Sequence, residues 1–208
     1  MTQPAPRPRR EAGRGGRPAV LTLGRIVTAA VEVLDAEGLD ALTMRRLGSR
    51  LGVAAMSLYR HVADRGALLA AVVDHLFAEA VVELDPADTW DEALSRFAVA
   101  YRGMLLAHPH AVPLLATHPV DTDTGTALLA GLLDRFDASG IDRQDALICV
   151  QSVGVYVLGH ALAQVGTPPG TSPGSGPEAG PDATAFYDHW FDTGLLAMVS
   201  GFERRLTP

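Results

Sequence analysis

The chain has 208 residues, of which 48% are hydrophobic, and a formal net charge of −7 at pH 7. This length allows one large domain or a small domain followed by a larger one, and the apolar content excludes an intrinsically disordered chain. The single cysteine, Cys149, excludes an internal disulfide and suits a reducing compartment. The first residues lack the charged-then-apolar pattern of a secretory signal, so we expect a cytoplasmic protein.

Positive charge is concentrated near the N-terminus. Residues 1–62 contain ten arginines and five acidic residues, a balance of +5, whereas residues 63–208 contain seven arginines and nineteen acidic residues, a balance of −12. All basic residues are arginines, whose guanidinium groups suit bidentate contacts to phosphate and guanine. This charge asymmetry predicts an N-terminal region that binds a polyanion and a remainder of the chain that stays soluble.

Residues 1–19 carry five arginines among prolines and glycines, and we expect a disordered basic arm. Two interpretations of this arm stay open. It either follows phosphates or the minor groove of DNA, as the arms of homeodomains do, or it is a solubilising leader.

From residue 20 onward apolar residues recur with helical spacing, and no segment shows the sustained alternation of a strand, so the sequence predicts an all-α fold. Gly38 ends the first helix, Thr43 caps a short second helix that Gly52 closes, and Asp64 caps a long one. Between these lies a short helix over about 54–61. Further helices are expected around 94–105, 129–136, 146–165 and 186–206, with a mobile Pro/Gly/Ser-rich loop over 166–184.

The segment 146–165 is long enough to span a membrane and contains no charged residue. Gln151, Ser152, His160 and Gln164 interrupt it, however, which favours a helix buried on all sides of a soluble protein. We expect it to lie between a ligand-binding core and a dimer partner, with no membrane involved.

Residues 43–62, TMRRLGSRLGVAAMSLYRHV, predict a helix-turn-helix with a tight turn at Gly52-Val53, held by Leu47, Leu51 and Leu58. Its second helix would enter the major groove of DNA. The alternative is a plain pair of helices with a solvated outer face; the charge split argues against it.

The segment 21–72 resembles the N-terminal domain of the TetR family, through the E-x-G-L-D-x-L-T entry to the second helix, the L-G-V turn and the S-L-Y-R-H-V recognition helix. Later segments, such as ALICVQSVGVYVLGHAL, are similar to the core helices of its tetracycline-repressor branch. The resemblance implies a homodimeric, ligand-responsive repressor of palindromic operator DNA. It implies a helix-turn-helix domain over residues 20–66 and a larger ligand-binding and dimerisation domain over residues 67–208.

The resemblance also implies which residues meet DNA. Arg45 stands where the family often reaches a guanine, and Thr43 and Arg65 stand at phosphate-clamping helix starts. For Tyr59 the alternative is that its ring only packs the helices together. The full candidate set is Thr43, Arg45, Ala55, Met56, Ser57, Tyr59, Arg60, His61 and Arg65.

Tetracycline-responsive members hold a magnesium–tetracycline chelate with polar side chains. Their places fall here at or near Val81, Phe97, Leu114 or Leu115, and Ala163, none of which offers the oxygen ligands that Mg²⁺ prefers. A shift of the alignment between residues 107 and 125 would bring His110 or His118 into the site. We expect a largely apolar effector and neither metal nor cofactor, in a cavity lined by Phe97, Tyr101, Leu115, His118, Leu129, Leu132, Leu147, Val150, Gln151 and Val155.

Other function classes find less support. His108, His110 and His118 fit no strong zinc pattern, and no nucleophile elbow or phosphate-binding loop is present, so we do not expect an enzyme. Two alternatives remain, namely a helix-turn-helix protein without ligand control and a small helical enzyme. Ligand-dependent loss of operator binding or catalytic turnover would distinguish them.

Overall fold

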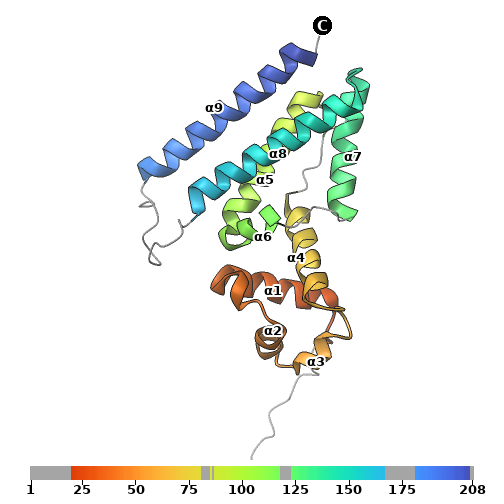
Figure 1. Cartoon of the computed structure of the whole chain (residues 1–208), viewed down its shortest axis with the longest axis vertical. Helices are drawn as coiled ribbons and strands as arrows, with labels where there is room; N and C mark the ends of the chain where they lie inside the picture. Colours follow the sequence, from red (N-terminus) through yellow and green to blue (C-terminus); the bar gives the residue numbers. More distant parts are fainter. Residues whose placement is uncertain (1–19, 81–84, 86, 118–122, 167–180, 207–208) are drawn as a thin grey trace, which may run out of the picture.

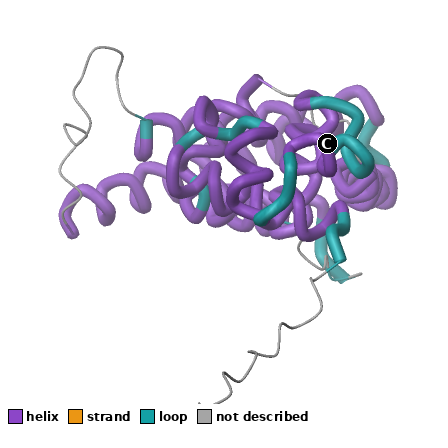
Figure 2. The backbone as a smooth tube through the Cα atoms, turned by 90° about the horizontal axis from the view of Figure 1, so that it is seen from below, coloured by secondary structure: helices purple, strands orange, loops and turns teal. Residues whose placement is uncertain are grey.

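The computed structural model describes residues 20–80, 85, 87–117, 123–166 and 181–206. Over these residues the chain consists of helices and the loops that join them, which confirms the all-α prediction (Figure 2). The elements are α1 (Leu23–Glu37), η1 (Leu39–Ala41), α2 (Met44–Leu51), α3 (Ala55–Leu58), α4 (Arg65–Glu79), α5 (Trp90–Ala107), η2 (Pro109–Ala111), α6 (Val112–Thr117), α7 (Asp123–Ala138), α8 (Arg143–Val165) and α9 (Pro181–Leu206). The predicted basic arm, residues 1–19, lies outside the described residues.

The helices form two groups joined by α4 (Figure 1). Helices α1, α2 and α3 pack together at one end of the molecule, and α5 to α9 form the larger group at the other. Helix α4 contacts α1 on one side and α5 and α7 on the other, and α8 packs against α5, α7 and α9. A movement of α4 would therefore change the packing in both groups of helices.

Side-chain caps set where several helices begin. Thr43 Oγ1 accepts from Arg46 N at 3.1 Å and Asp64 Oδ1 accepts from Ala67 N at 2.8 Å, which confirms both predicted caps. A capping box at the start of α5, in which Thr89 N donates to Glu92 Oε2 at 3.0 Å, was not predicted. Each such cap stabilises its helix by about 1 kcal/mol because it satisfies amides that have no partner inside the helix.

The buried face of each helix follows its apolar spacing. Leu47 and Leu58 are fully buried between α2 and α3, as predicted, and Leu68 and Leu76 of α4 are fully buried as well. In the larger group, Phe136 of α7 is fully buried and stacks obliquely on Trp90 with ring centroids 4.9 Å apart. The two groups share one hydrophobic core.

Four elements differ from the sequence prediction. Helix α3 ends at Leu58. The carbonyl oxygen of Leu58 accepts hydrogen bonds from the amides of His61 and Val62, so residues 59–61 form a turn instead of a longer helix. Helix α9 begins at Pro181, inside the predicted loop, because proline is tolerated at a first helical position, where its missing amide costs nothing. The short elements η2 and α6, between residues 109 and 117, were not predicted.

Helix α8 is, among the described residues, the one helix whose length and apolar composition would allow it to cross a membrane, with 39% of its most apolar window buried. Its packing against α5, α7 and α9 accounts for the buried side. The other side leaves Ile148, Val155 and Leu162 exposed in the isolated chain. An apolar helix that is buried on one side in this way also occurs in soluble proteins, so this composition is weak support for a membrane span.

Candidate functional site

The turn between α2 and α3 depends on two glycines. Gly52 adopts the left-handed conformation, with φ of 69°, that closes α2 as predicted. Gly48 has a different role, which the sequence reading missed. A Cβ atom at Gly48 would lie 2.9 Å from the carbonyl oxygen of Val53 and 3.2 Å from the amide nitrogen of Ala55, so only glycine allows the backbones of α2 and α3 to approach this closely.

The outer face of α3 and of the turn after it is open to solvent. Met56 and Tyr59 are 75% and 45% exposed, Arg60 and His61 are exposed, and Ser57 is half-buried. These residues were predicted to face DNA, together with the half-buried Ala55. The exposure of Tyr59 leaves its hydroxyl accessible to a partner, and its DNA contact stays a prediction.

The three arginines of α2 have different surroundings. Arg46 pairs with Glu37 through several hydrogen bonds, one of them from Nε to Oε2 at 2.9 Å, and Arg50 Nη2 lies 2.7 Å from Glu32 Oε2. Hydrogen bonding from Arg46 lowers the pKa of the Glu37 carboxyl, so this pair stays charged. Arg45 is exposed and forms no ion pair with any described residue, which leaves its guanidinium available for a base edge.

Thr43 and Arg65 are both engaged within the protein. The Thr43 side chain caps α2, and Arg65 donates from Nε to the carbonyl oxygen of Leu42 at 3.3 Å and from Nη2 to that of Leu39 at 3.4 Å. Arg65 therefore ties the start of α4 to the segment that leads into α2. Their predicted phosphate contacts would rely on the amides at the helix starts.

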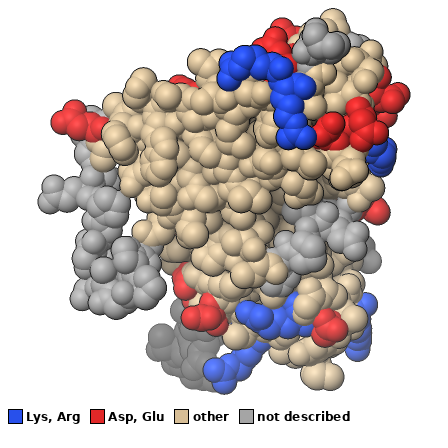
Figure 3. Space-filling model, turned by 45° about the horizontal axis from the view of Figure 1, so that its top comes forward, with Lys and Arg blue, Asp and Glu red and all other residues tan. Residues whose placement is uncertain are grey.

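Figure 3 shows arginine side chains in two areas of the surface. One area covers the small N-terminal group of helices at the bottom of the view, and the other lies at the opposite end, and acidic side chains lie beside both. A wide uncharged surface separates them. The described N-terminal helices thus carry arginine side chains at the end of the molecule that includes α3.

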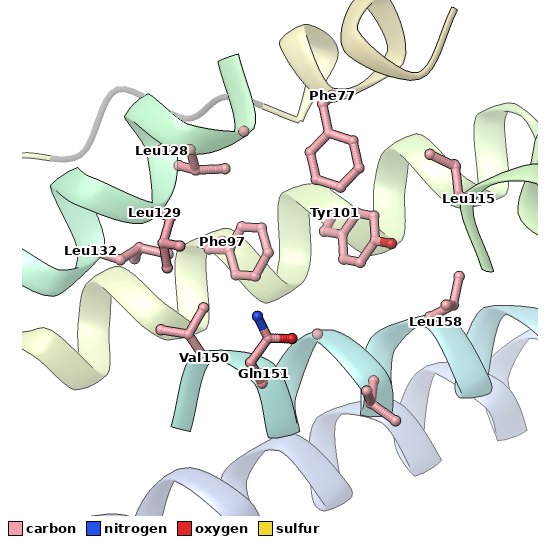
Figure 4. Close-up of a pocket in the computed structure, with 13 residues that line it drawn as sticks. Phe77, Phe97, Tyr101, Leu115, Leu128, Leu129, Leu132, Val150, Gln151 and Leu158 are labelled. Atoms are coloured by element: carbon pink, nitrogen blue, oxygen red, sulfur yellow. The ribbon is translucent and has the colours of Figure 1, made fainter. Parts of the chain in front are cut away.

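A cavity of about 280 Å³ lies between α4, α5, α6, α7 and α8 (Figure 4). Three aromatic rings form part of its wall. The rings of Phe97 and Tyr101 are stacked with centroids 5.6 Å apart, and Phe77 of α4 lies 5.3 Å from Tyr101. Its lining consists of Phe77, Phe97, Tyr101, Leu115, Gly125, Leu128, Leu129, Leu132, Val150, Gln151, Gly154, Val155 and Leu158.

Most of the residues predicted to line a ligand cavity meet there. The cavity brings together Phe97, Tyr101, Leu115, Leu129, Leu132, Val150, Gln151 and Val155. Leu147 packs against the core without reaching the cavity, and His118 lies outside the described residues. The sequence reading missed Gly154 and Leu158, although they follow Gln151 by three and seven positions, a helical spacing that could have revealed them. Phe77 had no such signal, because its helix is far away in the sequence.

The polar groups of the cavity are few and uncharged. Burial raises the pKa of Tyr101 to about 12, so its phenol remains a neutral hydrogen-bond donor. The Gln151 side chain points from α8 toward the side of the cavity that holds Phe97 and Tyr101 (Figure 4). Within the described parts of the chain, neither side chain has a hydrogen-bond partner, and no charged side chain lines the cavity. Two unpaired polar groups in an apolar pocket are the arrangement that orients a bound small molecule.

The described residues contain no group of three or more histidine, cysteine or acidic side chains arranged to hold a metal ion. Of the places where the resemblance would put magnesium–tetracycline ligands, Phe97 and Leu115 contribute apolar groups to the cavity wall. Val81 lies outside the described residues. The donors that the described residues bring to the cavity therefore do not fit a hydrated Mg²⁺ ion.

Comparison with known proteins identifies the family. Residues 26–72 match the family model for bacterial regulatory proteins of the tetR family, and residues 83–185 match that for the tetracyclin repressor-like C-terminal domain. A solved structure of ActR from Streptomyces coelicolor, in complex with actinorhodin, superposes with a TM-score of 0.75 at 28% identity, over 91% of this chain and 100% of that one. The chain belongs to the TetR family of transcriptional regulators.

Two curated relatives are similar over part of their length. An HTH-type transcriptional regulator of Saccharopolyspora erythraea is 34% identical over 145 residues, which are 70% of this chain and 61% of that protein. The HTH-type transcriptional repressor DrrR1 of Streptomyces coeruleorubidus is 31% identical over 157 residues, which are 75% of this chain and 58% of that protein. The matched part of the chain thus spans about three fifths of these relatives.

Proposed function

We propose that the chain is a transcriptional repressor that binds palindromic operator DNA as a homodimer and releases it when a small molecule enters the cavity. Residues 20–66 bind DNA, and residues 67–208 bind the effector and the second subunit. The protein acts in the cytoplasm, on the nucleoid when bound to DNA, and catalyses no reaction.

One observation carries this proposal, which is that α4 belongs to both candidate sites. Its first residue, Arg65, is hydrogen-bonded to the segment that leads into α2, and Phe77 in its last turn lines the cavity. A ligand that displaces Phe77 would move α4, and α4 would change the placement of the recognition helix. The two recognition helices of a dimer must sit about 34–36 Å apart to enter successive major grooves. A ligand that binds better to a differently spaced form draws the population away from DNA.

A homodimer would also cover apolar surface that the single chain leaves in water. Ile148 and Leu162 of α8 are 41% and 44% exposed, and Trp190 and Leu196 of α9 are 43% and 68% exposed. Several exposed apolar side chains on two neighbouring helices favour an interaction surface over a free one. The two helices pack side by side, partly because Gly194 leaves room for the ring of Tyr156. The corresponding pair from a second subunit would complete a four-helix bundle.

The cavity favours a planar, largely apolar effector without net charge. A flat ring system would stack against Phe97 and Tyr101, and the Tyr101 hydroxyl and Gln151 amide would bind one or two of its polar substituents. The solved ActR structure holds actinorhodin, which supports an effector for this chain too.

The first prediction concerns base recognition. Arg45→Ala should weaken specific operator binding by about 1–3 kcal/mol and relax the preference at one base pair, because a bidentate contact to guanine is lost. Operators recovered by selection from random duplex DNA, then titrated by fluorescence anisotropy, would measure both effects. The matched control is Arg50→Ala, which removes an exposed ion pair with Glu32 and should not change base preference. Unchanged specificity of Arg45→Ala would remove this residue from the DNA contacts.

A second prediction concerns the effector. Operator release should occur with planar aromatic compounds whether magnesium is present or chelated. For an effector found in this way, Tyr101→Phe should raise the half-maximal concentration about two- to tenfold, since one hydrogen bond contributes about 0.5–1.5 kcal/mol. Release by tetracycline at about micromolar concentration that requires magnesium would contradict the metal-free cavity. Failure of every compound to release DNA would favour a helix-turn-helix protein without ligand control.

A further inference from the structure

A cluster of ionisable side chains joins the two groups of helices. His108, at the C-terminal end of α5, lies with Nδ1 2.9 Å from Asp35 Oδ2 of α1 and Nε2 3.0 Å from Glu79 Oε2 of α4. Its side chain is 13% exposed. The neighbouring His110 adds a contact between Nδ1 and the backbone oxygen of Asp35 at 2.8 Å. We call the arrangement of Asp35, His108 and Glu79 the His108 bridge.

The geometry of the bridge determines the charge of the imidazole. Both ring nitrogens face carboxylate oxygens. An ionised carboxylate can accept hydrogen bonds but cannot donate one. A neutral imidazole has a single N–H and would turn the lone pair of its other nitrogen toward one of the two carboxylates. The doubly protonated imidazolium donates to Asp35 and Glu79 at once, and its charge is balanced by theirs.

The surroundings favour this charged form. Burial by itself would lower the pKa of His108, but the hydrogen bonds to Glu79 and Asp35 and the charges of these carboxylates outweigh it, and the pKa is raised. Two other histidines border the cluster. His75 approaches Glu79 from its own helix, with Nε2 3.8 Å from Oε1, and His110 binds the backbone of α1.

We propose that His108 is a positioning residue whose imidazolium fixes the DNA-binding helices against the cavity-bearing core and makes operator affinity depend on pH. The bridge holds the last turn of α1 through Asp35 and the last residue of α4, Glu79, two positions beyond the cavity residue Phe77. It therefore joins α1 of the DNA-binding group to the end of α4 that borders the cavity. The effect on operator affinity rests on the proposed function; the bridge itself does not.

The direction of the pH effect follows from the raised pKa. A group whose pKa is higher in the folded than in the unfolded protein stabilises the fold fully below its unfolded pKa, about 6.5 for histidine. That contribution is lost as the pH rises through the raised value. Above the raised pKa, the neutral imidazole of His108 donates only one hydrogen bond, so α1 and α4 are held less firmly. Operator binding must then supply the free energy that orders these two helices. Operator affinity should therefore fall with rising pH.

The test compares the full-length protein with His108→Gln, which keeps one donor but cannot carry charge, and with Asp35→Asn. The control is His189→Gln, an exposed histidine of α9 outside the bridge. In the wild type, the imidazole nitrogen resonances that vanish in His108→Gln should titrate above about pH 6.5. The melting temperature of the wild type should exceed that of His108→Gln most at about pH 6, and the difference should shrink toward about pH 9.

Operator affinity gives the third readout, with a fluorescein-labelled duplex recovered by selection. From about pH 6 to about pH 9 the wild type and His189→Gln should lose at least about fivefold more affinity than His108→Gln and Asp35→Asn. Any pH effect that arises at the DNA-binding surface itself is shared by all four proteins and cancels in this comparison. An imidazole that titrates at or below about pH 6.5, or a His108→Gln variant with the wild-type pH profile, would overturn the proposal. If no operator is recovered, the proposed function fails, while resonances and melting temperatures still decide on the bridge.

Discussion

Leu196→Arg is expected to turn the dimer into monomers and to reduce operator affinity at least about a hundredfold, because a monomer meets only one half-site at a time. Leu196 lies on α9, 68% exposed in the single chain, on the surface that we assign to the second subunit. A guanidinium there would be buried in apolar surroundings without a partner, which a dimer interface does not tolerate. Sedimentation at about micromolar concentration and anisotropy on the selected operator would measure both effects.

The choice of position separates assembly from folding. Val199, a turn further along α9, is only 8% exposed within its own chain, so an arginine there would disturb the subunit itself. Val99→Arg is the matched control, because Val99 is an exposed apolar residue of α5, at 57%, outside the proposed interface. This variant should remain dimeric and bind DNA. A wild-type protein that sediments as a monomer would contradict the proposed mechanism as a whole.

Gly48→Val should abolish operator binding by separating α2 from α3. Its side chain would begin 2.9 Å from the Val53 carbonyl oxygen and 3.2 Å from the Ala55 nitrogen, and both obstacles are backbone atoms that cannot rotate away. Overpacking of this kind costs about 1–3 kcal/mol or more. Thermal unfolding would show the loss of stability, and circular dichroism should show that most of the helical content of α4 to α9 persists.

Gly24→Val provides the comparison for this substitution. Gly24 also lies in a helix of the N-terminal group, but a Cβ atom there meets no other atom within 4 Å. The same change should therefore leave stability and operator binding nearly unaltered, since valine is no poorer a helix former than glycine. Equal effects at both positions would show that the close contact between α2 and α3 is unimportant.

Much of the architecture could be predicted from the sequence because it depends on neighbours along the chain. The caps at Thr43 and Asp64 and the left-handed Gly52 follow from the backbone chemistry of one or two turns. Periodicity likewise placed Phe97 and Tyr101 on one face of α5, and Val150 and Gln151 on α8, where they meet at the cavity. The error at Pro181 arose because a Pro/Gly-rich composition marks a loop without showing where the loop ends.

The sequence by itself thus determined the helical fold, the helix-turn-helix and the character of the cavity wall. Only the tertiary structure decided which arginines are already paired, since Glu32 and Glu37 reach Arg50 and Arg46 from another helix. It alone brought Phe77 to the cavity and His108 to Asp35, 73 positions away. The physical reason is the distance along the chain over which each kind of interaction acts. Backbone hydrogen bonding and helical periodicity act over a few residues, whereas the pairing of charges and the closing of a cavity depend on how whole helices pack.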